Sequence, residues 1–575
     1  MDGIVIHSNP NQAGSHNSKC GYDAPKHFPV FSASPYQCLL SPLRSQNRAR
    51  EGNSIIRIVQ VTFFDDAEIE RTYNIYNDTR HDQNCRIEYT VSLDNELLLE
   101  DRFTFFQPVA ERYDWKLILP RVSVTQKSEM KLAAVLYHGD QEAHRMEKTY
   151  TIYPASIKTI PVSEKRNIYY CGDDQAYQII STLVPNCERI DDFASLNSMC
   201  ETVIVEPHLH GGNQAIYKSD LWDYIRAGGS VVQLEQSQFS LQYADLVYSP
   251  RFSTHIGVPN HPILEGLSEK DLLYWKPDIV EERPESIIQS LFRKSAGNGI
   301  SILESDTEHT PLVEYSDGRS MIVMNQVELI ENFNNVPQAA ILLRNILNYV
   351  LNRKPVKQGN TGIIAGESAK NFLQKTGLKA ENAADDLALY DLLLVDISTL
   401  PEEIDKQLAE YLRNGGQVLF LPFTNAADER LSRILGHMVT TKKSETYHLK
   451  TMDNSGTVYG ISACDLFQFL PNSVIAEYAF QLEDGKELMH DVPGNPWYDY
   501  YVNGTHYGFS NRGLICINKA NKKEEETYMA EAVVGNGKAV LSQICMDPNN
   551  RKDLRIYGQL LTNMAAMLKL PVWEH

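Results

Sequence analysis

The stretch Asp223–Leu234 reads DYIRAGGSVVQL, and the stretch Glu410–Leu421 reads EYLRNGGQVLFL. In both, an amphipathic helical segment runs into a pair of glycines, and an apolar strand follows at once. Glycine enters left-handed backbone conformations without the penalty of a Cβ atom, so a glycine pair often ends a helix. This helix–turn–strand signal occurs twice and predicts a repeated α/β unit.

Three weaker echoes keep the same order in both halves of the chain. Because repeated order is stronger evidence than any single short motif, we interpret them as an internal duplication. The first copy is expected over about 166–354 and the second over about 361–575. The echoes are Ile168–Gly172 with Ile363–Gly366, Gly266–Leu272 with Gly460–Leu466, and Asp317–Arg319 then Asn334–Asn335 with Asn536–Lys538 then Asn549–Asn550.

Length and charge restrict the possible classes of protein. The 575 residues exceed one hydrophobic core and suggest three or four domains. The formal net charge of -20 argues against a nucleic-acid partner, which needs a basic face. No apolar run approaches the roughly 20 residues that span a bilayer, so no membrane segment is expected. The amino end has no signal-peptide pattern.

Residues 54–154 alternate between apolar and polar side chains, which is typical of half-buried strands. About 100 residues of short strands without a helical stretch predict an immunoglobulin-like β-sandwich. Residues 1–53, rich in Asn, Ser, Pro and Gly, are expected to be an irregular segment. The expected strands are Ile55–Val61, Thr72–Tyr76, Cys85–Val91, Lys131–Tyr137 and Lys148–Tyr153.

In each α/β copy, short apolar strands alternate with helical segments, which predicts βαβ units and a mainly parallel sheet. Linkers are expected at Pro154–Lys165 and Arg353–Asn360. Each copy is expected to close with an amphipathic helix, Ala339–Leu351 in the first and Ile556–Leu568 in the second.

The repeat unit resembles the class I glutamine-amidotransferase-like fold, a flavodoxin-like α/β sandwich. The resemblance rests on the strand order, on His261–Leu267 and on the Gly-Arg strand near Gly318. Amidotransferases of this class attack with a cysteine thiolate on a strand-to-helix turn. Here Glu206–Gly212 and Asp396–Pro401 follow the corresponding strands, and neither holds a Gly-x-Cys-x-Gly motif. The units are therefore expected to be degenerate, without catalytic residues.

No metal or cofactor is expected, because the nine cysteines are scattered and have no zinc-ligand spacing with histidine. Two segments remain as candidate ligand sites. Glu206, His208 and His210 follow a central strand, where ligands usually bind in open α/β sheets; a hydrogen-bonded loop is the alternative to a metal site. The aromatic segment with Trp497, Tyr498, Asp499 and Tyr501 suits either a sugar or a buried domain interface.

The order of the parts resembles the carboxyl-terminal region of bacterial glycoside hydrolases of family 2, the β-galactosidase and β-mannosidase relatives. The matching stretches are Phe28–Arg44, Tyr73–Thr79 and His261–Trp275. The family's catalytic glutamates belong to a barrel that has no counterpart here. The resemblance implies a non-catalytic accessory region, with a catalytic glycosidase domain or subunit as partner, possible homo-oligomers and a periplasmic or secreted location.

Two other functions remain open on the sequence. One is a stand-alone carbohydrate-binding protein that acts through Trp497 and Tyr498. The other is a glycosidase with its site at the strand ends of the first α/β copy, near Glu206, His208 and His210.

Overall fold

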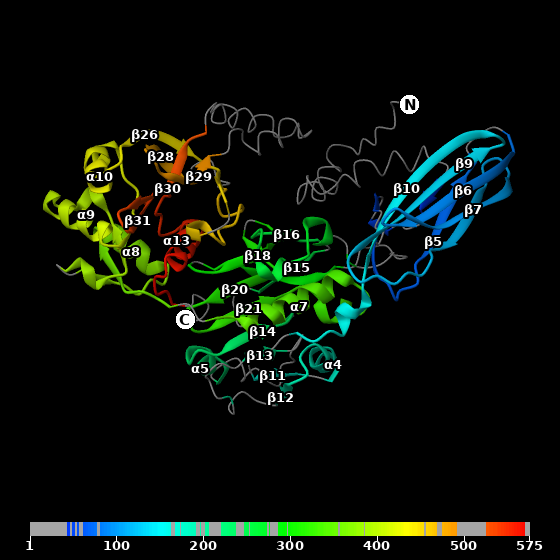
Figure 1. The fold of residues 1–575 in the computed structure, drawn as a ribbon, viewed down its shortest axis with the longest axis horizontal. Coiled ribbons are helices and arrows are strands. Elements are labelled where there is room, and N and C mark those ends of the chain that lie inside the picture. Colours follow the sequence, from blue (N-terminus) through cyan, green and yellow to red (C-terminus); the bar gives the residue numbers. More distant parts are fainter. Residues whose placement is uncertain are drawn as a thin grey trace.

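A computed structural model shows three parts in a row, a β-rich part at one end and two α/β units beside it (Figure 1). The protein is thus a multidomain protein of β plus α/β type. The residues that the structure describes are 43–45, 49–51, 54–56, 61–77, 81–162, 167–172, 174–190, 196, 202–205, 220–236, 246–251, 253–272, 275, 286–295, 297–306, 308–354, 357–383, 386–453, 456–467, 474–491 and 525–569.

The β-rich part contains a three-stranded sheet in the order β1-β5-β8 and a five-stranded sheet in the order β4-β10-β9-β6-β7. Alternate side chains of both sheets, among them Tyr73, Ile87, Trp115 and Leu132, pack into one core. The strands are β1 (Leu43–Ser45), β2 (Ala49–Glu51), β3 (Ser54–Ile56), β4 (Thr62–Phe64), β5 (Glu70–Tyr76), β6 (Gln83–Leu93), β7 (Glu96–Gln107), β8 (Arg112–Ile118), β9 (Ser128–His138) and β10 (Gln141–Tyr153).

The strands expected at 72–76, 85–91, 131–137 and 148–153 are confirmed as parts of β5, β6, β9 and β10. Of the strand expected over Ile55–Val61, only Ile55 and Ile56 lie in a described strand, β3. The sequence reading missed β7 and β8. β7 pairs only with β6, at the edge of its sheet, and exposes most of its side chains, so it shows no clear alternation.

The first α/β unit contains an eight-stranded sheet with helices on both faces. Its elements are β11 (Ile168–Cys171), α4 (Asp174–Leu183), β12 (Cys187–Arg189), β13 (Thr202–Val205), α5 (Asp220–Arg226), β14 (Ser230–Gln233), β15 (Leu246–Arg251), β16 (His255–Ile256), η4 (Pro262–Leu264), η5 (Glu269–Leu272), β17 (Ile288–Arg293), β18 (Ile300–Glu304), β19 (His309–Thr310), β20 (Leu312–Ser316), β21 (Met321–Asn325), α6 (Leu329–Asn332) and α7 (Pro337–Asn352).

The second α/β unit contains a ten-stranded sheet. Its elements are β22 (Thr361–Ile364), α8 (Glu367–Lys375), β23 (Glu381–Asn382), β24 (Leu392–Val395), α9 (Asp405–Arg413), β25 (Gln417–Phe420), α10 (Asp428–Leu435), β26 (Val439–Thr446), β27 (Leu449–Thr451), η10 (Gly456–Val458), β28 (Ala476–Leu482), β29 (Lys486–Asp491), β30 (Thr527–Val534), β31 (Gly537–Ser542) and α13 (Arg551–Asn563).

The two sheets have the same topology. Their main orders are β12-β11-β13-β14-β21-β20-β18-β16 and β23-β22-β24-β25-β31-β30-β28-β26. In each, the first five strands pair in parallel and the last three pair antiparallel. Each sheet is therefore mixed rather than mainly parallel, because β20–β21 and β30–β31 are joined by tight turns instead of crossover helices.

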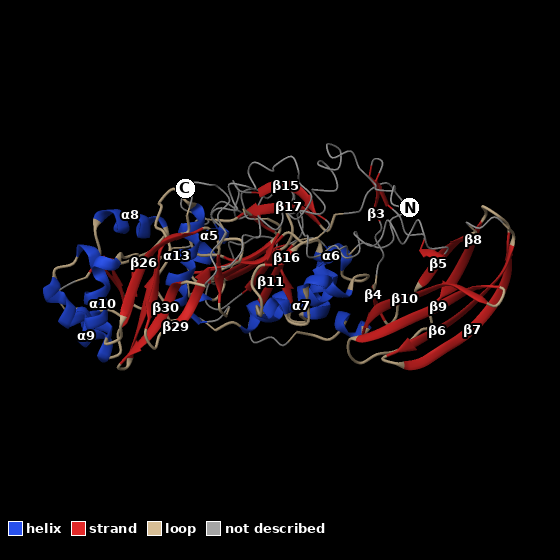
Figure 2. Ribbon diagram, turned by 90° about the horizontal axis from the view of Figure 1, so that it is seen from above, coloured by secondary structure: helices blue, strands red, loops and turns tan. Residues whose placement is uncertain are grey.

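Strand side chains separate into two cores, one on each face of the sheet. In β24, Leu392 and Leu394 pack in one core with α8 and α13, whereas Leu393 and Val395 pack in the other with α9 and α10. Figure 2 shows these helix pairs on opposite sides of the strands. Since successive residues of a strand point to opposite faces, a fully apolar strand is required where both faces are covered.

The glycine pair has the same geometry in both units. Gly228 and Gly415 have φ angles of +108° and +106°, which favour glycine. The next glycines, Gly229 and Gly416, donate to the carbonyls of Tyr224 and Tyr411, both at 3.0 Å. A Cβ atom on Gly416 would lie 2.2 Å from the Tyr411 ring. The repeated sequence thus fixes a helix end against the ring of a tyrosine from its own last turn.

One expected helix has the wrong bounds, and part of one expected linker contacts a core. The last helix runs over Arg551–Asn563, not Ile556–Leu568, because the Asn550 side chain caps it and Ala565 then turns to a φ of +62°. In the described part of the expected linker at Pro154–Lys165, Val162 is buried in the core of the first unit and donates to the Leu183 carbonyl at 2.7 Å. The closing helix of the first unit, α7, includes all of Ala339–Leu351.

We expect Gly416→Ala to lower the stability of the second α/β unit by about 1–3 kcal/mol, because the new methyl group overlaps the Tyr411 ring. That ring cannot move freely, since its hydroxyl donates to the Tyr390 carbonyl at 3.0 Å. Differential scanning calorimetry measures the change. In a Tyr411→Ala background, Gly416→Ala should lower the stability by less. An equal loss of stability in both backgrounds would refute the steric explanation.

Candidate functional site

The carboxyl ends of the parallel strands are the first place to look for a site, because ligands of open α/β sheets bind there. The candidate residues predicted from the sequence, Glu206, His208 and His210, follow β13 along the chain, but they lie outside the described residues. The aromatic candidates Trp497, Tyr498, Asp499 and Tyr501 also lie outside them. Both sets therefore stay predictions.

In the first unit, the described part of this edge is a buried polar cluster that the sequence reading missed. Glu235 and Gln326 follow the adjacent strands β14 and β21 and are 4% and 2% exposed. The Gln236 N–H donates to Gln326 Oε1 at 3.0 Å. Neither Glu235 Oε2 nor Gln326 Nε2 has a hydrogen-bond partner within the described part of the chain.

Burial raises the pKa of the Glu235 carboxyl to about 8, and the nearby charges of Glu328 and Glu331 add to the effect. Glu235 is therefore mostly protonated at neutral pH and has a hydrogen to donate. A buried carboxyl with a raised pKa at a strand end is a common feature of functional sites. The signal in the sequence was a charged residue directly after an apolar strand.

The same edge has a different composition in the second unit. Gln543 follows β31 by the interval at which Gln326 follows β21, and it bonds both the N–H of Phe423 (3.3 Å) and its carbonyl (3.0 Å). Pro422 and Phe423 stand where the first unit has Glu235 and Gln236. The glutamine is thus common to both units, whereas its neighbours are acidic and polar in one and apolar in the other.

This apolar edge borders a cavity of about 330 Å³ that contains Cys545. Burial raises the pKa of the Cys545 thiol to about 12, and the charge of Asp553 adds to the shift. A thiol with that pKa stays protonated and is a poor nucleophile. Cys545 is therefore not suited to amidotransferase chemistry. The five described cysteines, including Cys545, form no disulfide with one another.

A second repeated feature lies at the junctions between the parts. In the first unit, the Ser268 hydroxyl donates to Asp271 Oδ2 at 2.6 Å, and in the second the Ser462 hydroxyl donates to Asp465 Oδ2 at 3.1 Å. Both turns follow a glycine of nearly equal φ, +78° at Gly266 and +79° at Gly460. We call this four-residue element the Ser-x-x-Asp turn. In each unit it holds one buried carboxylate.

Each Ser-x-x-Asp turn contacts the part that precedes its unit. Asp271 accepts from the Tyr153 hydroxyl of β10 at 3.3 Å and lies 3.7 Å from Lys127 Nζ, a side chain that is 47% exposed. The closing helix α7 contacts the β-rich part as well, since the Thr62 hydroxyl donates to Gln338 at 3.1 Å. The first junction is thus a mixture of buried apolar and half-exposed polar contacts.

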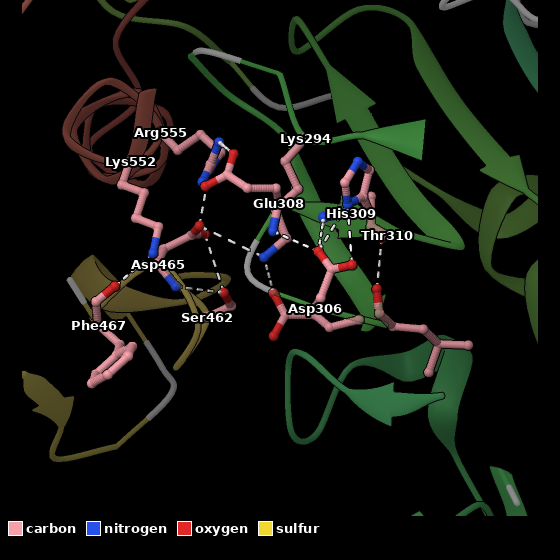
Figure 3. A network of polar contacts seen from close by, with 12 residues as sticks. Lys294, Asp306, Glu308, His309, Thr310, Ser462, Asp465, Phe467, Lys552 and Arg555 are labelled. Carbon is pink, nitrogen blue, oxygen red and sulfur yellow. Dashed lines mark hydrogen bonds and ion pairs between the residues drawn. The ribbon is translucent and has the colours of Figure 1, made fainter. Parts of the chain in front are cut away.

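The second junction is a buried ionic cluster (Figure 3). Asp465 Oδ1 accepts from Arg555 Nε of α13 at 2.9 Å and lies 3.6 Å from Lys294 Nζ of the first unit. Lys294 is 1% exposed and also pairs with Glu304. Burial alone would lower the pKa of Lys294, but the charges of Asp465 and Glu304 outweigh it and raise the pKa. The ammonium group therefore stays charged inside the junction.

The closing helix α13 approaches the first unit closely at this junction. A Cβ atom on Gly558 would lie 2.4 Å from the Gly297 carbonyl carbon, so only glycine fits there. Arg551 donates to the Lys294 carbonyl at 2.8 Å. The echo at Gly460–Leu466 marked this turn in the sequence, but the partner Lys294 could not be inferred, because it lies in the other unit.

Within the described residues, no group of three or more His, Cys, Asp or Glu side chains is placed to hold a metal ion. None of the helices that the structure describes has the length and apolar character needed to cross a bilayer.

Comparison with known proteins finds similarity to solved glycoside hydrolases. A β-galactosidase from Rahnella sp. R3 is 10% identical over 67% of this chain and 55% of that chain, with a TM-score of 0.24. A β-galactosidase from Bacillus circulans sp. alkalophilus is 8% identical over 64% of this chain and 54% of that chain, with a TM-score of 0.23. A β-galactosidase from Halorubrum lacusprofundi is 11% identical over 63% of this chain and 54% of that chain, with a TM-score of 0.22.

The chain spans about half the length of these β-galactosidases. No protein-family model matches the sequence, and no curated protein matches it as a relative. Because the TM-scores are low, function has to be argued from the residues of the chain itself.

We expect the stability of the protein to depend on the charge of Glu235. An acid whose folded pKa (about 8) exceeds its unfolded value (4.5) loses stability as pH rises between the two values, because only the unfolded carboxyl ionises freely. Glu235→Gln should remove this loss, so the variant gains up to roughly 3–5 kcal/mol over the wild type by pH 8. Melting temperatures measured from pH 4 to 9 would show the curves diverging.

Asp553, whose buried carboxyl also has a raised pKa of about 7, titrates in both proteins and cancels in that comparison. The exposed Glu429→Gln is the matched control and should follow the wild-type curve. Parallel curves for Glu235→Gln and wild type would show that Glu235 is ionised in the folded protein.

The two junction carboxylates should differ in their importance. Asp465→Asn leaves Lys294 and Arg555 buried with less opposing charge and should destabilise the contact between the α/β units by about 3–5 kcal/mol. Asp271→Asn should cost about 1 kcal/mol at most, because Lys127 is half exposed. Calorimetry and limited proteolysis near residues 354–360 measure both effects. Equal costs would contradict the charge-burial argument.

Proposed function

We propose that this chain is a non-catalytic accessory region of a glycoside hydrolase of the β-galactosidase type. In this proposal the β-rich part is an immunoglobulin-like sandwich, and the two α/β units are degenerate amidotransferase-like domains. Their parallel strands follow the order 2-1-3-4-5 along the sheet, which is the flavodoxin-like order. The stretches Tyr73–Thr79 and His261–Trp275 resemble the same region of family 2 enzymes.

The observation that carries the proposal is the repeated docking of each α/β unit through its Ser-x-x-Asp turn and its closing helix. Interfaces between domains of one chain are otherwise often small and polar, so that the domains move. Here a buried aspartate and a packed helix fix each unit to the part before it. A stiff row of domains suits a role in bracing or shaping a neighbouring active site, or in oligomerisation.

A second candidate is a glycosidase at the strand ends of the first α/β unit. One observation favours it: burial raises the pKa of the Glu235 carboxyl to about 8, and the charge of a second carboxyl group, that of Glu328, adds to the shift. Glycoside hydrolysis uses two carboxyl groups, one of them a general acid with a raised pKa. The acid role would belong to Glu235 in this reading.

The test separates the two candidates. The purified chain is assayed with 4-nitrophenyl β-D-galactopyranoside and 4-nitrophenyl β-D-mannopyranoside from pH 5 to 8. The accessory role predicts no turnover above the rate of Glu235→Gln. Turnover that Glu235→Gln abolishes and Glu429→Gln preserves would overturn the accessory role and support the second candidate. The transcript upstream of codon 1 should encode a catalytic barrel in frame, and an in-frame stop there would count against the proposal.

A further inference from the structure

The cavity of about 330 Å³ in the second α/β unit lies where β22, β24, β25 and β31 end. Its position is the carboxyl edge of the parallel strands, the usual ligand position of the fold. The lining residues are Ser368, Ala369, Asp396, Leu421, Pro422, Phe423, Thr424, Glu477, Tyr478, Gln543, Cys545 and Met546.

The first turn of α8 lines one side of the pocket. The helix's own bonding begins with the Lys370 N–H, which donates to the Gly366 carbonyl at 3.1 Å. The N–H groups of Ser368 and Ala369 precede that bond, and Gly366 has no side chain to cap them. Both residues line the cavity. The helix start therefore offers backbone donors and a partial positive charge.

Hydrogen-bond acceptors lie beside these donors. Asp396 Oδ1 accepts from the N–H of Ser398 at 3.1 Å, and its other oxygen, Oδ2, faces the start of α8. A Cβ atom on Gly366 would lie 3.9 Å from that Oδ2, which places this oxygen close to the first turn of α8. Glu477, an exposed residue of β28, adds a second carboxylate to the lining.

The remaining wall is apolar. Leu421 and Phe423 are buried beneath the cavity, and Tyr478 and Met546 are partly exposed in its lining. Such side chains take up the C–H faces of a ligand by removing them from water. A volume of about 330 Å³ is at the lower end of small-molecule sites, so one ring fits better than an extended chain.

Donors and acceptors in one small pocket discriminate between ligand types. An anion would be repelled by the carboxylates of Asp396 and Glu477. An ammonium group has no acceptor to offer, so the N–H groups at the start of α8 would stay without a partner. A hydroxyl group both donates and accepts, so it satisfies both sides. We propose that this pocket binds a neutral polyhydroxyl ring, a single pyranose, with its hydroxyls between α8 and the two carboxylates and its C–H face on Tyr478 and Met546.

This site goes beyond the accessory role proposed above, and it is a binding site rather than a reaction centre. The Cys545 thiol stays protonated beside it and supplies no nucleophile. In the described part of the first α/β unit the corresponding wall is polar, since Glu235 and Gln236 stand where the second unit has Pro422 and Phe423.

Saturation-transfer difference NMR tests the proposal on the full chain with methyl β-D-galactopyranoside, methyl β-D-mannopyranoside and methyl β-D-glucopyranoside. At least one should bind. Glu477→Gln removes an acceptor and Thr424→Trp fills the cavity, so each should weaken binding at least tenfold. Glu429→Gln makes the same chemical change outside the pocket and should bind as the wild type does. Melting curves confirm that each variant is folded.

Inorganic phosphate and ethylammonium are the anion and cation probes. Stronger binding of either than of the pyranosides would overturn the proposal, as would pyranoside binding that both pocket variants leave unchanged. The proposal would also be overturned if none of the three pyranosides binds. Because the readout is binding and not turnover, each of these outcomes leaves the accessory role to be decided by the aryl-glycoside assay.

Discussion

The arrangement of the two α/β units depends on the ion pairs made by the carboxylate of Asp465. It lies inside the protein between Arg555 of its own unit and Lys294 of the other. Buried charges are costly unless each one is paired, so displacement of either unit would strand an ion in a low-dielectric interior. The close approach of α13 at Gly558 acts in the same direction, since it leaves no space for sliding.

One unit appears twice in the chain and has kept some features and changed others. The glycine pair and the Ser-x-x-Asp turn have nearly the same geometry in both units. The glutamine after the fifth parallel strand accepts from an equivalent backbone N–H in each unit, and in the second unit it also donates to the Phe423 carbonyl. These features hold the scaffold or the junctions. The residues around the glutamine differ, with Glu235 in the first unit and Pro422 in the second. The carboxyl edge of the parallel strands therefore differs between the units, whereas the framework is shared.

Much of the framework could be predicted from local sequence signals. The glycine pair, the apolar runs of β24 and β25 and the limits of α7 depend on neighbouring residues, so pattern and turn chemistry locate them. The candidate sites were harder. Glu235 and Lys294 acquire their character from burial and from partners far along the chain, which no local pattern encodes. The helix α13 was misplaced because an apolar segment continues past Asn563, where the chain turns away to pair with Leu378.

The two junctions stand in series along the molecule, and they are unequal. The first relies on Asp271 with the half-exposed Lys127, and the second on ions sealed from water. A pulling force applied at the two ends passes through both contacts with the same magnitude. Added salt screens exposed charges far more than enclosed ones. Under load, or at high ionic strength, the β-rich part should therefore detach first, while the two α/β units travel together as one block.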